Sequence, residues 1–185
     1  MTFSAQPRKP RPPLDEAGLF DYAVRSLGRM MRTEAELRRL MEKRIEPGPA
    51  AEAMMARVTV RLKEYGYLND TVFAETYTRL RQENEKFGQR RVRQSLSQKG
   101  VPQQIIGDVI EARYGNTNEE TLAREHLERK RIKKPENEKE TARVMRRLIA
   151  AGFSPSTVYK ILRQWDLPEE TLAALESVDE DSPVE

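Results

Sequence analysis

The chain contains no cysteine and only one histidine among its 185 residues. The absence of cysteine excludes disulfide bridges and thiolate metal sites and is typical of a reducing compartment, so we expect a cytoplasmic protein. No apolar run approaches the length of a membrane span, and the N-terminal stretch lacks the apolar region of a signal peptide. We therefore expect no membrane partner.

Sequence signals for catalysis are equally scarce. The phosphate-binding pattern GxxxxGK[ST] does not occur, and the carboxylates stand mostly among basic residues, as in helix-surface ion pairs. The one histidine, His126, follows Leu122 by four positions on the apolar face of a predicted helix. That position favours a buried, hydrogen-bonded histidine over a metal ligand or a catalytic base. We expect no enzymatic activity, no metal and no cofactor.

Charge is abundant and unevenly distributed, although the net charge is only +3. Residues 79–99 contain seven basic and two acidic side chains, and residues 124–147 contain ten and five. Residues 166–185 contain eight acidic side chains and no Lys or Arg. This asymmetry favours a polyanionic partner, but it equally fits a helical protein whose charged surface keeps it soluble.

Helical periodicity runs through most of the chain, and no segment alternates as a strand does. The pairs Tyr22-Ala23, Phe73-Ala74 and Leu122-Ala123 begin similar segments, 51 and 49 residues apart. This spacing predicts an all-α fold, an elongated and curved array of three tandem three-helix repeats. The alternative is an irregular bundle of nine helices. The predicted parts are a flexible, basic, proline-rich arm (1–15), the repeats (16–67, 68–115 and 116–166) and a partly disordered acidic tail (167–185).

One helix corner recurs in the repeats. Glycine is the fifth residue of "LSQKGVPQQII" (96–106) and of "LIAAGFSPSTV" (148–158). In "LMEKRIEPGPA" (40–50) the fifth residue is Arg44. We expect Gly100 to supply the turn at its corner, Gly152 to repeat it, and Arg44 to use a different backbone conformation. Capping boxes are predicted at Thr33–Glu36 and at Thr117–Glu120.

Basic side chains cluster on the predicted second helices. Lys86, Arg90 and Arg93 are spaced i, i+4 and i+7, opposite Val92 and Leu96, and a similar group surrounds Arg143. A strip of this kind suits a phosphate backbone, although a solvated helix face is the alternative. The candidate filament- and nucleic-acid-binding residues are Lys86, Arg90, Arg91, Arg93, Lys99, Arg143, Arg146 and Arg147.

"YGYLNDTVFAETYTRLRQENEKFGQRRVRQSLSQKGV" (65–101) resembles the central repeat of the RecX family, regulators of the RecA recombinase. "TEAELRRLMEKR" (33–44) and "LIAAGFS" (148–154) are similar to the first and last repeats, so the resemblance covers roughly residues 16–165. The chain departs from the family pattern at Ala150 and Ala151, where a basic pair is expected, and this removes positive charge from the last repeat.

The resemblance implies a protein that binds along the RecA–DNA filament, inhibits the recombinase and modulates recombination, DNA repair and the SOS response. It implies a RecA filament as partner and weak, electrostatic DNA binding, and we expect a monomer. The motif residues Tyr67, Leu68, Phe73, Ala74, Leu96 and Phe153 are interpreted as core. The competing hypothesis is a helix-turn-helix regulator or nucleoid-associated protein that binds DNA without a recombinase.

Overall fold

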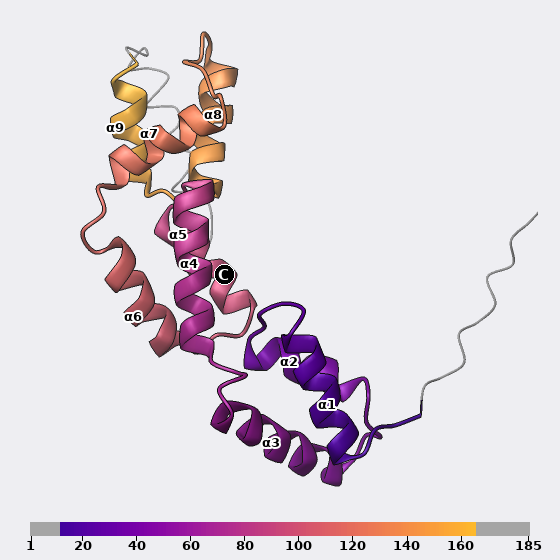
Figure 1. The fold of residues 1–185 in the computed structure, drawn as a ribbon. Coiled ribbons are helices and arrows are strands. Elements are labelled where there is room, and N and C mark those ends of the chain that lie inside the picture. The colour runs from indigo at the N-terminus through magenta and orange to yellow at the C-terminus, as the bar shows by residue number, and fades with distance from the viewer. Residues whose placement is uncertain (1–11, 166–185) are drawn as a thin grey trace, which may run out of the picture. The chain divides into compact units, whose positions relative to one another are not determined.

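A computed structural model of the chain describes residues 12–165, which form nine α-helices and no strand (Figure 1). The helices are α1 (Glu16–Leu27), α2 (Glu34–Glu42), α3 (Pro49–Glu64), α4 (Asp70–Glu85), α5 (Gln89–Gln98), α6 (Gln103–Tyr114), α7 (Glu119–Arg129), α8 (Glu138–Ala150) and α9 (Pro155–Arg163). Within this range no helix is long and apolar enough to cross a membrane. The all-α prediction is confirmed. The acidic tail and most of the basic arm lie outside the described residues.

The helices belong to two compact units. The first comprises the chain up to Phe73 together with Lys99–Val101, and the second comprises Ala74–Gln98 and the chain from Pro102 onwards. This division does not follow the repeat boundaries expected from the sequence, which stay a prediction.

The core of the first unit lies between α1, α2 and α3, which pack against one another in all three pairs. Leu19, Leu37 and Met41 are completely buried there. Helix α1 ends at Leu27, and Met31, four positions later, is 49% exposed. Tyr67, which was interpreted as core, is 52% exposed because the chain turns at Gly66 immediately after α3.

The second unit buries its apolar residues mainly between α5 and α6 and between α7, α8 and α9. Leu96 and Phe153 are completely buried, and Ala74 is as well, so these core predictions are confirmed. Leu68 and Phe73, in the first unit, are also buried as expected.

Of the two predicted capping boxes, one is confirmed and the other is wrong. Thr33 and Glu36 form the predicted capping box at α2. The second capping box is wrong, because Asn118 caps α7 by accepting from the Thr121 amide at 3.0 Å. The Thr117 hydroxyl instead donates to the Arg113 carbonyl at 3.1 Å and accepts from the Gln82 amide.

The two corner glycines turn the chain as expected, and both are left-handed, Gly100 at φ 80° and Gly152 at φ 95°. Arg44 does not adopt this conformation, since the described non-glycine residues with positive φ are Lys86 and Arg131. The expected difference between the first corner and the other two is therefore confirmed.

Hydrogen bonds to the corner carbonyls explain why glycine is needed. In the first unit the Thr33 hydroxyl, at the start of α2, donates to the Lys99 carbonyl at 2.6 Å. In the second unit, the amides of Gly88 and Arg90, at the start of α5, donate to the carbonyls of Ala151 and Gly152. A Cβ atom at Gly100 would come closer than 3.0 Å to Ala35, and one at Gly152 equally close to the Arg91 amide. Each corner thus lies against the start of an earlier second helix, where a side chain does not fit.

The first corner has no earlier second helix within the described residues. Its Arg44 carbonyl accepts from the Leu14 amide at 2.8 Å, so an extended segment supplies the donor. A side chain is therefore tolerated at this corner.

Candidate nucleic-acid and filament interface

Helix α5 presents three arginines to solvent. Val92 and Leu96 are completely buried and fix which side of the helix faces the core. Arg90, Arg91 and Arg93 are exposed. This arrangement confirms that α5 has an apolar side and a basic side, as expected from the sequence.

Helix α8 repeats the arrangement in the same unit. Val144 and Met145 are buried and Leu148 is completely buried, whereas the other side of the helix is basic. The exposed arginines of α8 are Arg143, Arg146 and Arg147.

Several other cations of the unit have a carboxylate partner, which the six arginines do not. Lys86, Arg113, Arg124 and Lys130 each lie within 4 Å of a glutamate oxygen. No such ion pair is formed by the six arginines of α5 and α8 with any residue of 12–165. Their charges are compensated by solvent and are available to an anionic partner.

Arg90 does act on one carboxylate at longer range. Burial raises the pKa of Glu119. Hydrogen bonds from Ser154 and Thr157 lower it, and so does the positive charge of Arg90. Together they outweigh burial, so the pKa of Glu119 lies below its ordinary value. The Ser154 hydroxyl donates to Glu119 at 2.5 Å and the Thr157 hydroxyl at 2.6 Å. Glu119 is thus a structural acceptor that holds the start of α9.

Lys86 does not lie on α5 with Arg90 and Arg93, and that part of the predicted basic face is wrong. Helix α4 ends at Glu85, and Lys86 follows in a left-handed conformation with φ 54°. The Lys86 amide donates to the Gln82 carbonyl at 3.1 Å, which is the bond of the αL motif that ends a helix. The Lys86 ammonium pairs with Glu125 at 2.7 Å.

Lys99, another candidate, belongs to the first unit and is engaged there. Its ammonium lies 2.7 Å from a Glu36 carboxylate oxygen and 5.7 Å from the centre of the Phe73 ring. An anionic partner would have to compete with Glu36 for this charge. A binding role for Lys99 stays a prediction.

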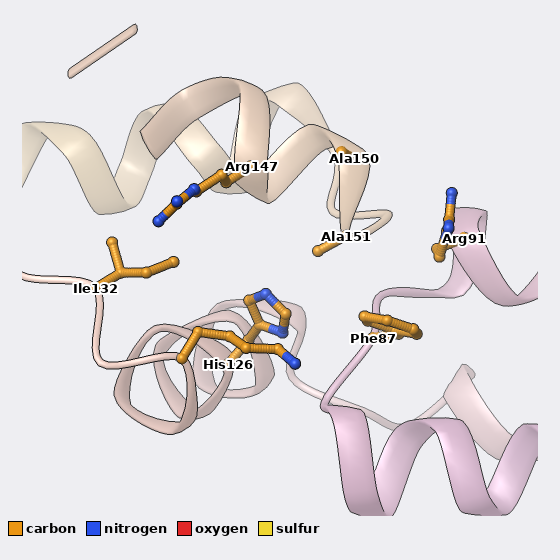
Figure 2. A pocket seen from close by; sticks show the side chains of 8 residues that line it. Phe87, Arg91, His126, Ile132, Arg147, Ala150 and Ala151 are labelled. Carbon is orange, nitrogen blue, oxygen red and sulfur yellow. The ribbon is translucent and has the colours of Figure 1, made fainter. Parts of the chain in front are cut away.

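A pocket of about 480 Å³ brings two candidate arginines together (Figure 2). Arg91 comes from the start of α5 and Arg147 from the last turns of α8, and Lys130, at the end of α7, adds a third cation. Phe87 and His126 lie side by side between them, with ring centres 6.0 Å apart. Ala150 and Ala151 also line the pocket, so the two positions that depart from the family pattern leave it open.

His126 has the structural role expected of it. Its side chain is 4% exposed, and its Nδ1 lies 3.0 Å from the Glu85 carbonyl oxygen. Burial lowers the pKa of His126, so the ring is neutral at pH 7. Glu85 is also the partner of Lys130, whose hydrogen bond lowers the pKa of the Glu85 carboxylate. No group of His and acidic residues within 12–165 is arranged to hold a metal ion.

The sequence did not single out Phe87, Lys130 or Ile132 as pocket residues. Lys130 belongs to the basic run 129–134, which was a weak signal. Phe87 and Ile132 gave no sequence signal, because each follows a helix end and lies outside any helical repeat of apolar residues.

The described residues form nine helices and no strand, and this defines the class of all-helical proteins. Residues 69–110 match the family model described as "RecX, second three-helix domain". The chain is 33% identical to Regulatory protein RecX of Mycolicibacterium vanbaalenii over 146 residues, covering 75% of this chain and 77% of that protein. It is 32% identical to Regulatory protein RecX of Mycolicibacterium smegmatis, covering 77% and 76%.

The chain belongs to the RecX family of regulatory proteins. Regulatory protein RecX of Deinococcus radiodurans is 38% identical, although the aligned part spans only 51% of that relative and 59% of this chain. A crystal structure of RecX from Lactobacillus salivarius has the same fold, with a TM-score of 0.62 at 20% identity over 83% of this chain and 97% of that one.

Proposed function

We propose that this protein regulates a RecA-type recombinase, mainly by inhibiting it, by binding along the RecA–DNA filament. In this role it would modulate recombination, DNA repair and the SOS response. The single observation that supports the proposal best is the set of six exposed arginines on α5 and α8, which are unpaired within the described residues of a RecX-family chain.

The proposed contact is electrostatic and repeated. Arginine suits such a contact because its guanidinium can donate two parallel hydrogen bonds to a phosphate or a carboxylate, the two anionic groups a nucleoprotein filament offers. Similar basic helices on one chain would raise the overall affinity through effective concentration, even where each contact is weak.

A charge-reversal experiment tests the assignment. Arg90→Glu/Arg91→Glu/Arg93→Glu should weaken binding to preformed filaments at least about tenfold near physiological salt and weaken inhibition of strand exchange to match. The matched control, Arg39→Glu/Lys43→Glu/Arg163→Glu, changes three other exposed residues and the net charge by the same amount. Equal loss in both variants, or undiminished inhibition by a folded α5 variant, would contradict the assignment.

Co-sedimentation distinguishes this proposal from DNA binding without a recombinase. A recombinase regulator should sediment with preformed filaments at salt concentrations at which it no longer sediments with bare DNA. If binding to bare DNA is as tight as binding to the filament, the helix-turn-helix or nucleoid-protein hypothesis is favoured.

A further inference from the structure

The first unit contains a pocket of about 430 Å³ whose rim is dominated by arginine. Its lining includes Tyr22, Arg25, Ser26, Arg29, Arg32 and Arg44. Arg25 lies in the last turn of α1, Arg29 and Arg32 in the connection to α2, and Arg44 just after α2. We call this the four-arginine pocket. None of its arginines belongs to the basic helix faces predicted from the sequence.

Three of the four arginines are held by partners that carry no charge. Arg25 Nε donates to the Asp21 carbonyl at 3.1 Å, and Arg32 Nε donates to the Ser26 hydroxyl at 3.0 Å. The Arg44 guanidinium lies 5.1 Å from the centre of the Tyr22 ring. These contacts orient the side chains but leave their positive charges uncompensated.

Four other cations of the unit differ, because each of them pairs with a glutamate. Lys63 pairs with Glu34 at 2.6 Å and Arg57 with Glu16 at 2.8 Å, and Arg38 and Lys99 also have glutamate partners. In the described part of the chain no carboxylate lies within 4 Å of an arginine nitrogen of the four-arginine pocket. Four like charges around one hollow repel one another, and an anion placed among them removes that repulsion.

We propose that the four-arginine pocket binds the phosphodiester backbone of a nucleic acid. A tetrahedral phosphate can accept from several guanidinium groups at once, which matches a site with four donors on different elements. The pocket lining also includes Leu14, which Arg8, Lys9 and Arg11 precede in the sequence. Because these three basic residues lie within six positions of Leu14 in the sequence, an extended polyanion is favoured over a single small ion.

This inference rests on that part of the proposed function which makes nucleic acid a partner. It is tested on DNA alone, so its failure leaves the recombinase assay unaffected. The probe is a fluorescein-labelled oligothymidylate, with a duplex of random sequence as a second probe. Binding is followed by fluorescence anisotropy over a series of salt concentrations, using the full-length chain.

The test variant is Arg29→Gln/Arg32→Gln and the control is Arg39→Gln/Lys43→Gln, which removes the same charge outside the pocket. Each lost phosphate contact should lower the slope of log affinity against log salt by about 0.7 on single strands, which is about fivefold in affinity at about 0.1 M salt. The test variant should therefore bind roughly 25-fold more weakly, with a slope reduced by about 1.4. Arg29→Lys, which keeps the charge on an exposed side chain, should retain most of the slope.

Two results would overturn the proposal. One is a test variant whose affinity and slope match those of the control. The other is polyglutamate binding as tightly as the oligonucleotide and with the same dependence on Arg29, which would assign the pocket to an acidic polypeptide. Circular dichroism establishes that the variants are folded. If Arg32→Gln disturbs the start of α2, Arg25→Gln/Arg29→Gln is used as the test variant instead, and the same loss of slope is expected.

Discussion

Replacement of Gly152 by alanine should destabilise the second unit severely, although it adds only one methyl group. Gly152 is buried, and its φ of 95° is a conformation that side chains disfavour. The new Cβ would lie closer than 3.0 Å to the Arg91 amide and to the Gly88 carbonyl oxygen. Both are backbone atoms, so no flexible side chain can move aside to relieve the contact.

The expected cost has two parts. Placing alanine in a left-handed conformation costs about 1–2 kcal/mol, and forcing an additional carbon into a packed contact costs about 1–3 kcal/mol. A shift of the corner would also strain the bond from the Gly88 amide to the Ala151 carbonyl, now 2.9 Å. The sum, about 2–5 kcal/mol, corresponds to a fall in Tm of roughly 10–30 °C for a unit of this size.

Thermal and urea unfolding followed by circular dichroism measure this loss. Gly107→Ala is the matched control, because Gly107 lies inside α6 and a Cβ there meets nothing within 4 Å. That variant should be stabilised by about 0.5–1 kcal/mol. Gly88→Ala should lose only the packing part, since Gly88 has no positive φ and its Cβ would meet the Gly152 backbone. A Gly152→Ala protein within about 0.5 kcal/mol of the parent would refute the reasoning.

Two further predictions concern single side chains. NMR titration of His126, the one histidine of the chain, should give a pKa below the ordinary 6.5. Because the unfolded chain binds that proton more readily than the folded protein, the free energy of unfolding should fall as the pH drops below 6.5. His126→Gln should abolish this contribution. A measured pKa above 6.5 would contradict the prediction. Thr33→Val should lower the free energy of unfolding of the first unit by about 1–3 kcal/mol, through loss of the helix cap and of the bond to Lys99, whereas exposed Thr71→Val should change little in urea unfolding.

The helices and the corners could be predicted from the sequence because they rest on local rules. Thr33 followed by Glu36 correctly marks the start of α2, and glycine at the repeated position of Gly100 and Gly152 correctly marks a turn. Thr117 shows the limit of such rules, because Asn118 beside it is an equally good cap and α7 starts there.

The binding surface was less accessible to sequence reasoning, because it depends on where helices end. Lys86 has the spacing of a helix face with Arg90, yet Lys86 is itself a left-handed residue that follows the end of α4, and α5 begins only at Gln89. The four-arginine pocket combines Arg29, in a helix connection, with Arg44, fifteen positions later. No periodic pattern relates these positions, and their proximity arises only when α1 and α2 pack together.

The hydrogen bonds to the corner carbonyls constrain how a gene of this family can be lengthened. Leu14, Thr33 and Gly88 each donate to a corner that comes later in the chain. A repeat added before the first one would bring a helix start against Arg44, where the other corners have glycine, and would meet its side chain. A duplicated repeat added after α9 would find a helix start at Asn137 and Glu138 of α8, and would bring its own corner glycine. We therefore expect the protein to tolerate tandem duplication of a repeat better toward the 3′ end of its gene than toward the 5′ end.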